Sequence, residues 1–194
     1  MSTFPNLLEF LKQTDYSVAI FDLDNTLVDL NVDWGALKMF LKKKHEEMFG
    51  TPQDFTRLMI GLECVQRNHG QAQYELFSNL IAEWEISAAK TRAIELKNRT
   101  CFLPQLKNEG KYVAIFTGNV KEAAEIVLER FNLLKSVDFI VGRRESPKLK
   151  PDPSGLQIIL AHFKITPQNA IYIGDAEIDL AAGKAAGIPT FILS

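Results

Sequence analysis

Short apolar segments recur at wide intervals along this chain of 194 residues, and longer amphipathic segments separate most of them. Five of the apolar segments have four or five residues, are rich in Val, Ile and Phe, and are apolar at nearly every position. Strands that are buried on both faces of a parallel sheet have this pattern. The five segments lie at 18–21, 112–116, 137–141, 170–173 and 189–193.

Helical periodicity fills the intervals between the last four of these segments, at 120–131, 154–163 and 177–186. Strands that alternate with helices of this length predict βαβ units. We therefore expect an α/β fold with a doubly wound, Rossmann-like sheet of five mostly parallel strands.

The interval from 31 to 100 departs from this alternation, because it contains no convincing strand. Its amphipathic stretches predict helices that are broken near Gly50-Thr51-Pro52, His69-Gly70 and Ile86-Ser87. Aromatic and Met positions at helical spacing indicate the core of a helical bundle rather than a ligand site. These positions are Phe40, Met48, Phe55, Tyr74, Phe77 and Trp84. We expect a core formed by 1–30 and 101–194, with an all-helical insertion at 31–100.

Two carboxylates, Asp22 and Asp24, directly follow the first predicted strand in the stretch AIFDLDNTLVDL. Because strand side chains alternate between faces, residues two apart point the same way, and strand geometry carried through Asp24 would crowd two negative groups. Ligands of open parallel sheets bind beyond the carboxyl ends of the strands. The other strand ends therefore bear on why this pair is tolerated.

The second core strand ends in Thr117-Gly118-Asn119, just before a predicted helix. A hydroxyl and free backbone N–H groups at a helix start can hold an oxyanion or a phosphate. The plain alternative is that Thr117 or Asn119 only caps the helix. After the third strand, Lys150 lies in the stretch KPDP, where it is either a solvated surface lysine or a residue whose backbone the two prolines hold in place.

The fourth strand ends in Gly174-Asp175, and Asp179 follows four residues later, one helical turn on if the helix has begun. A helix N-cap would explain Asp175 but not Gly174 or Asp179. The four carboxylates at this edge of the sheet repel one another, and a single lysine offsets only part of their charge. We therefore expect a cation among them. Oxygen ligands without His or Cys suit a hard ion, of which Mg²⁺ is the most available.

Composition limits the classes of partner. The chain is 46% hydrophobic and 24% charged with a formal net charge of −2, which is typical of a soluble globular protein and leaves no extended basic field for nucleic acid. The two cysteines, Cys64 and Cys101, have neither CxxC nor zinc-like spacing, which favours reduced thiols in a reducing compartment. We see no secretory signal and no apolar run near the roughly 18 residues of a membrane helix, so we expect a cytoplasmic protein without a membrane partner.

The stretches FDLDNTLVD, FTGN, KPDP and GDAEIDLAAGKAAG, in this order, resemble the four motifs of the haloacid dehalogenase-like (HAD) phosphohydrolases. A helical insertion just after the first motif resembles the C1 cap of the phosphoglycolate phosphatase-like branch, in position and helical type only. The resemblance covers 18–29 and 112–193. It implies a Mg²⁺-dependent phosphatase of a small phosphorylated metabolite, with the cap closing over the substrate.

The resemblance also implies roles for the catalytic residues. Asp22 would attack phosphorus and form a phospho-aspartate, and Asp24 would protonate the leaving oxygen and later activate water. Lys150 would steady the nucleophile and the developing charge, and Thr117 would act beside it on the phosphoryl group.

Metal and phosphate ligands follow from the same resemblance. Mg²⁺ would be held by Asp22, the backbone carbonyl of Asp24 and Asp175, with direct or water-mediated support from Asp179. Phosphoryl oxygens would be held by Thr117, by the N–H groups of Gly118 and Asn119, and by Lys150.

Departures from the family pattern leave alternatives open. Asn25 stands where many relatives have Gly, Leu30 stands where they often have Ser, and Lys148 competes with Lys150. An acid/base residue at Asp24 fits a phosphatase or a phosphomutase of a sugar phosphate, and a non-catalytic HAD-fold binding protein is the third hypothesis. The predicted insertion also carries cationic side chains that could meet a second anionic group or only face solvent: Arg57, Arg67 and Arg92. We expect a monomer or a weak dimer.

Overall fold

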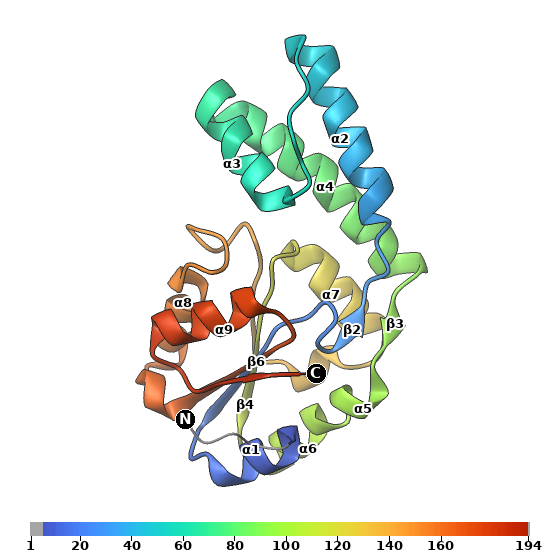
Figure 1. Ribbon diagram of the computed structural model, residues 1–194. Helices are drawn as coiled ribbons and strands as arrows, with labels where there is room; N and C mark the ends of the chain where they lie inside the picture. The colour runs from blue at the N-terminus through green and yellow to red at the C-terminus, as the bar shows by residue number, and fades with distance from the viewer. Residues whose placement is uncertain (1–5, 194) are drawn as a thin grey trace.

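Five parallel strands form the central sheet of the computed structural model, which describes residues 6–193 (Figure 1). The order across the sheet is β5-β4-β1-β6-β7, and every neighbouring pair is parallel. The strands are β1 (Val18–Phe21), β4 (Tyr112–Phe116), β5 (Phe139–Val141), β6 (Ala170–Gly174) and β7 (Thr190–Ile192). All five lie within the predicted segments or one residue beyond them, and the α/β fold class is confirmed.

The central strand β1 lies where the strand order reverses direction. Phe21, its last residue, is in register with Ile115 of β4 and with Ile173 of β6. The carboxyl ends of these three strands therefore reach the same edge of the sheet. This is the topological switch point, where open α/β sheets bind their ligands.

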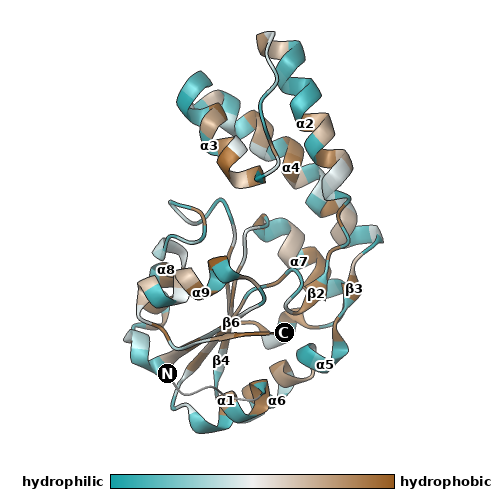
Figure 2. Ribbon diagram, in the orientation of Figure 1, coloured by the Kyte–Doolittle hydropathy of each residue, from teal (hydrophilic) through white to brown (hydrophobic). Residues whose placement is uncertain are grey.

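Helices cover both faces of the sheet. Ala19 and Phe21 of β1 belong to a hydrophobic cluster with α1 (Leu7–Gln13), α6 (Phe102–Asn108) and α7 (Lys121–Arg130). Val18 and Ile20, which point the other way, belong to a second cluster with α8 (Ser154–Phe163) and α9 (Glu177–Ala186). The two clusters explain why the strands are apolar at successive positions (Figure 2).

Beyond the carboxyl edge of the sheet lie three helices, α2 (Trp34–Phe49), α3 (Leu58–His69) and α4 (Gln71–Thr91) (Figure 1). The chain leaves the sheet for these helices after β2 (Val28–Asp29) and returns from them before β3 (Ile94–Glu95). These two strands pair as a two-stranded antiparallel ribbon. The remaining short helices are α5 (Lys97–Thr100), η1 (Leu134–Ser136) and η2 (Pro167–Asn169).

Several details of residues 31–100 differ from the sequence prediction. The predicted break at Ile86-Ser87 is wrong: α4 continues through it, because its buried positions Phe77, Ile81, Ala88 and Ala89 keep helical spacing across that point. The strand β3 was not predicted, since two residues are too few for a recognisable pattern.

The predicted break at Gly50-Thr51-Pro52 is longer than expected, because the next helix, α3, begins only at Leu58. In the loop before it, the Asp54 side chain accepts a hydrogen bond from the Thr56 N–H (2.7 Å), a local turn that competes with helix. Of the predicted bundle positions, Phe55 and Phe77 are buried and stacked, with ring centroids 5.6 Å apart. Phe40 and Met48 are exposed on α2, which α4 and α3 cover on one side only, so the core prediction is wrong for these two.

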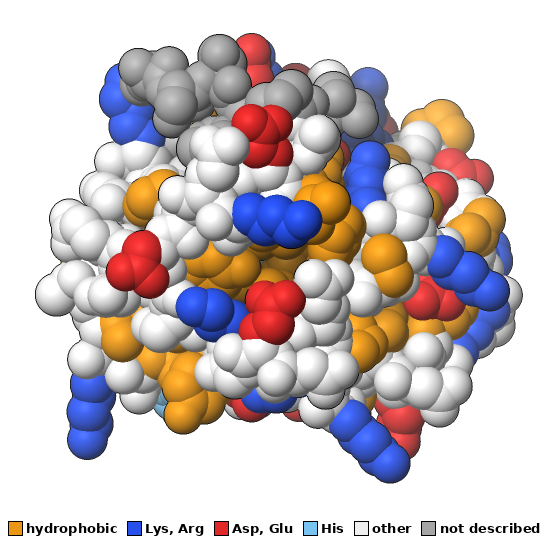
Figure 3. All heavy atoms as spheres, turned by 90° about the horizontal axis from the view of Figure 1, so that it is seen from below, with side chains coloured by type: hydrophobic (Ala, Val, Ile, Leu, Met, Phe, Trp, Pro, Cys, Tyr) orange, Lys and Arg blue, Asp and Glu red, His pale blue; other side chains and the backbone are white. Residues whose placement is uncertain are grey.

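The surface and the helices bear on the expected partners. On the face opposite α2–α4, acidic and basic side chains are interspersed with apolar ones, and the described residues of this face form no continuous basic patch (Figure 3). Among residues 6–193, no helix has the length and the apolar character needed to cross a membrane.

Candidate active site

A cavity of about 270 Å³ opens at the carboxyl ends of β1, β4 and β6. It is lined by residues at the strand ends and in the loops that follow them, and by residues of the α2–α4 helices. Every residue that the sequence singled out as a candidate for catalysis, phosphate binding or metal binding is among its lining residues: Asp22, Asp24, Thr117, Gly118, Asn119, Lys150, Asp175 and Asp179. Residues up to 157 positions apart are thus brought to one place, from Asp22 to Asp179.

Lys150 connects two of the aspartates. Its Nζ donates to Asp22 Oδ1 at 2.6 Å and to Asp179 Oδ1 at 2.7 Å, and its side chain is only 5% exposed. Lys148, the competing candidate, has a side chain that is 74% exposed and pairs with Asp152 at 3.5 Å. The lysine in contact with the aspartates is therefore Lys150.

Asp179 is fixed by donors on both of its oxygens. Oδ1 accepts from Lys150 and from the Tyr172 hydroxyl (2.6 Å), and Oδ2 accepts from the Ala176 N–H (3.2 Å). Burial raises the pKa of Tyr172 well above its ordinary value, so its hydroxyl keeps the proton that it donates. A Cβ at Gly174 would lie 2.5 Å from the Asp179 carboxyl carbon, which explains the glycine before Asp175.

Sequence reasoning did not identify Tyr172 as part of the site. It lies within the apolar strand β6, where an aromatic residue is expected in the core, and no local signal distinguishes its hydroxyl. The N-cap alternative for Asp175 is wrong, because Ala176 is the N-cap of α9 and the carboxylate that binds its N–H belongs to Asp179.

Three carboxylates lie close enough to share a metal ion. Asp22, Asp175 and Asp179 each offer an oxygen, and these oxygens lie within 4.8 Å of one another. Asp175 Oδ1 also accepts from the Thr26 hydroxyl at 3.4 Å. Because all the donors are oxygen atoms, the cluster fits a hard divalent cation.

The turn after β1 holds Asp24 beside Asp22. The Asp22 N–H continues the sheet by donating to the Ile173 carbonyl (2.8 Å), whereas Asp24 Oδ1 accepts from the Leu30 N–H (2.8 Å). Asn25 has φ of 59°, the left-handed conformation that Asn tolerates better than most residues. This accounts for the departure from Gly at this position.

Burial raises the pKa values of both Asp22 and Asp24 toward neutral pH. Desolvation raises the pKa of Asp22 to about 6, although the Lys150 charge opposes the shift. Desolvation raises the pKa of Asp24 to about 7, opposed by the Leu30 N–H and increased by the Asp22 charge. Asp24 therefore keeps a proton near neutral pH more readily than Asp22, which has a lysine against it.

The turn after β4 is held by two hydrogen bonds between Thr117 and Asn119. The Thr117 hydroxyl donates to Asn119 Oδ1 (2.9 Å) and accepts from the Asn119 N–H (3.1 Å). The Asn119 N–H is thus already engaged, while Gly118 lines the cavity with its backbone. The alternative that Thr117 or Asn119 caps the next helix is wrong, because α7 begins after Val120 without a side-chain cap from either.

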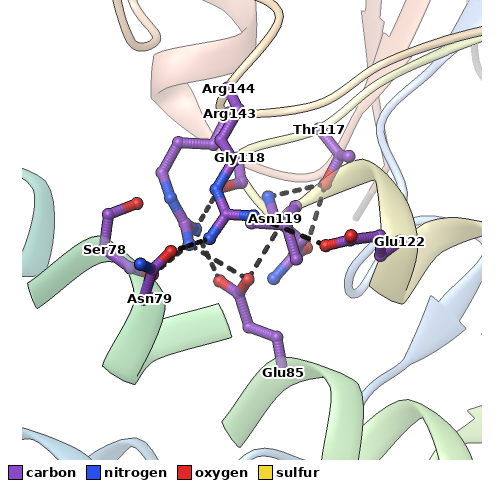
Figure 4. A network of polar contacts seen from close by, with 10 residues as sticks. Ser78, Asn79, Glu85, Thr117, Gly118, Asn119, Glu122, Arg143 and Arg144 are labelled. Carbon is purple, nitrogen blue, oxygen red and sulfur yellow. Dashed lines mark hydrogen bonds and ion pairs between the residues drawn. The ribbon is translucent and has the colours of Figure 1, made fainter. Parts of the chain in front are cut away.

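A buried ion pair, which the sequence did not reveal, supports this turn (Figure 4). Glu85 of α4 and Arg143 of the loop after β5 have side chains that are 1% and 0% exposed, and Arg143 Nη1 donates to Glu85 Oε1 at 2.7 Å. Arg143 Nη1 also donates to the Gly118 carbonyl (2.8 Å), and Glu85 Oε2 accepts from the Val120 N–H (3.0 Å). The pair therefore links α4 to both sides of the turn.

Comparisons with known proteins identify the family of the chain. A family model described as haloacid dehalogenase-like hydrolase matches residues 19–193, so the chain belongs to that family. Phosphoglycolate phosphatases of Cereibacter sphaeroides and Aquifex aeolicus are each 29% identical to it. The first match covers 87% of this chain and 81% of the relative, and the second 89% and 82%.

Among solved structures, that of a predicted phosphoglycolate phosphatase from Haemophilus somnus has a TM-score of 0.67 at 18% identity, covering 94% of this chain and 87% of the other. This likeness shows the fold. The sequence relatives place the chain in the phosphoglycolate phosphatase-like branch, and it is an enzyme of the phosphoric monoester hydrolase class rather than a non-catalytic binding protein.

The Glu85–Arg143 pair predicts a large loss of stability in Glu85→Gln, because a buried guanidinium is left without its counter-charge. We expect the free energy of unfolding, measured in urea, to fall by about 3 kcal/mol. The matched control is Glu122→Gln, which removes the exposed partner of the neighbouring Arg144 (3.5 Å) and should cost less than about 1 kcal/mol. Equal losses in the two variants would contradict the structural role of the buried pair.

The raised pKa of Asp24 predicts a pH-dependent effect of Asp24→Asn in metal-free protein. The native state binds this proton more tightly than the unfolded state, whose carboxyl has a pKa of 3.8, so the stabilising contribution present at low pH is lost as pH rises through about 7. Asn carries no charge at any pH. With a chelator present, the variant should come close to the wild type in unfolding free energy at about pH 4 or below, and its advantage should grow as the pH rises from about 4 to about 7 and then level off. A difference independent of pH would contradict the shift.

Proposed function

We propose that the protein is a Mg²⁺-dependent phosphatase that hydrolyses a small phosphorylated metabolite through a phospho-aspartate intermediate on Asp22. The observation that carries the proposal is the contact between Asp22 and Lys150 within the three-aspartate cluster, at the switch point of the sheet. A second carboxyl with a raised pKa, Asp24, lies two residues away.

Asp22 is the proposed nucleophile. Lys150 Nζ holds its Oδ1 at 2.6 Å, which restrains the rotation of the carboxylate and keeps a positive charge beside the reacting group. A carboxylate oxygen of Asp22 attacks phosphorus, an acyl phosphate bond forms, and the ester P–O bond breaks. Covalent catalysis divides one difficult displacement into two easier ones.

Asp24 is the proposed acid and base. With a pKa near 7 it can give its proton to the leaving oxygen in the first step. In the second step the resulting carboxylate takes a proton from water, which hydrolyses the acyl phosphate and restores Asp22. The Leu30 N–H holds Asp24 Oδ1 and so fixes the orientation of its carboxyl group.

The oxygen cluster is the proposed Mg²⁺ site, with Asp22, the backbone carbonyl of Asp24 and Asp175 as ligands. Asp179 already accepts hydrogen bonds on both oxygens, which favours a supporting position through water over a further direct bond. When bound, Mg²⁺ offsets the repulsion between the carboxylate nucleophile and the anionic phosphoryl group.

Thr117, the Gly118 and Asn119 backbone and Lys150 are the proposed phosphoryl ligands. All four residues line the cavity. The Asn119 N–H is already bound to the Thr117 hydroxyl, so its use would require that turn to rearrange, whereas the Gly118 N–H needs no such change. The buried Glu85–Arg143 pair supports this turn through hydrogen bonds to the Gly118 carbonyl and the Val120 N–H.

Residues 31–100 are the proposed cap, and 1–30 with 101–194 the proposed core. Trp34, Met59 and Glu85 of the cap line the same cavity as the aspartates, an arrangement that lets a closed cap exclude water from the reacting groups. Free thiols at Cys64 and Cys101 support the cytoplasm as the place of action. The expected monomer or weak dimer stays a prediction.

Activity measurements test this proposal directly. Purified protein should hydrolyse an aryl phosphate in the presence of Mg²⁺ and should stop when a chelator removes the metal. Asp22→Asn should abolish turnover, a loss of at least about 10³-fold, because the amide is a poor nucleophile. Unfolding in urea serves as the control that the variant is folded; wild-type activity in this variant would refute the assignment of the nucleophile.

Product analysis separates hydrolysis from phosphomutase chemistry, which uses the same two aspartates. Release of inorganic phosphate in equal amount to the substrate consumed is the expected result. Recovery of the phosphoryl group on another hydroxyl of a sugar phosphate would identify a mutase instead.

A further inference from the structure

Five large apolar side chains line the cavity together with the polar residues described above, one of them Phe116 at the end of β4. Trp34, at the start of α2, and Met59, in the first turn of α3, come from the α2–α4 side. Leu149, next to Lys150, and Ile178, next to Asp179, come from the sheet side. Apolar walls therefore face the cavity from both sides, and Leu149 is adjacent in sequence to Lys150, one of the proposed phosphoryl ligands.

Cationic side chains in the same lining are already engaged. Of the described residues that line this cavity, three carry a positive charge: Arg143, Lys148 and Lys150. Lys150 is bound to two aspartates. Arg143 is fully buried, with its charge paired to Glu85 through both Nη groups, and only its Nε is without a hydrogen-bond partner. Lys148 lies at the rim, largely in solvent, and pairs with Asp152.

The α2–α4 helices contribute no free cation to the cavity. Their arginines that could meet a second anionic group, Arg57, Arg67 and Arg92, are exposed, and none of them is among the lining residues. The charged side chain that these helices do contribute is Glu85, whose carboxylate is neutralised by Arg143. A second anion on the substrate would therefore find no unpaired counter-charge on this side.

We infer that the leaving group of the substrate is uncharged and largely apolar, unlike the carboxylate-bearing glycolate of phosphoglycolate. The inference rests on the proposed phosphatase function and names its substrate class. A carboxylate held against Trp34 and Met59 would lose hydration without gaining a partner, which is costly. An apolar group in the same place gains free energy from the surface that it removes from water.

Two phosphate monoesters of primary alcohols test the inference, because their leaving groups differ mainly in charge and polarity. We expect kcat/KM of the Mg²⁺-loaded wild type to be at least about tenfold higher for benzyl phosphate than for phosphoglycolate. A preference for phosphoglycolate would overturn this inference and leave the proposed phosphatase function intact. Hydrolysis of neither ester, nor of an aryl phosphate, would overturn both.

Met59→Arg provides a sharper test within the same protein. It places a cation in the wall, and we expect the ratio of kcat/KM for phosphoglycolate to that for benzyl phosphate to rise about tenfold. The matched control is Met39→Arg, which adds the same charge to α2 at a position that is 69% exposed and does not line the cavity, and it should leave the ratio unchanged. An equal rise in both variants would show a long-range charge effect and contradict the role of the wall.

Discussion

The position of Lys150 between Asp22 and Asp179 is the interaction on which the site depends. Parallel strands end together, so carboxylates from β1 and from the segment after β6 converge on one edge of the sheet and repel each other. A buried lysine within 2.7 Å of both offsets part of this repulsion. Desolvation still dominates, because the pKa of Asp22 remains raised to about 6.

Neutralisation of buried charge also organises the other side of the cavity. Glu85 and Arg143 are removed from water together, and each also makes a hydrogen bond to the backbone of the turn after β4, at Val120 and Gly118. A buried pair is weak evidence for net stability, whereas loss of one partner is strongly destabilising because it leaves an uncompensated buried charge. Its consequence for recognition is that the charge of Arg143, although this residue lines the cavity, is already compensated by Glu85.

Local pattern was sufficient for the strands of the sheet and for the candidate residues at their carboxyl ends, which the structure brings to one cavity. The five strands and the helices α7, α8 and α9 follow from apolar runs and helical periodicity, which tertiary contacts did not override. Errors occurred where that signal is weak. Ile86-Ser87 was interpreted as a break although α4 is continuous, and β3 has only two residues. Tyr172 and the Glu85–Arg143 pair were missed because each joins segments distant in sequence through a side chain whose local context is ordinary.

The sequence by itself determined the alternation of strands and helices, the helical character of 31–100 and the polar residues that follow each strand, because these depend on short-range periodicity and residue type. Only the tertiary structure decided which lysine contacts the aspartates, which groups cap α7 and α9, and which arginine reaches the cavity. Those outcomes depend on distances between segments up to 157 positions apart, and on burial, which sets charge pairing and pKa. Packing of α4 against the core places Glu85 on Arg143, and this contact leaves the cavity with apolar walls and no unpaired cation from α2–α4.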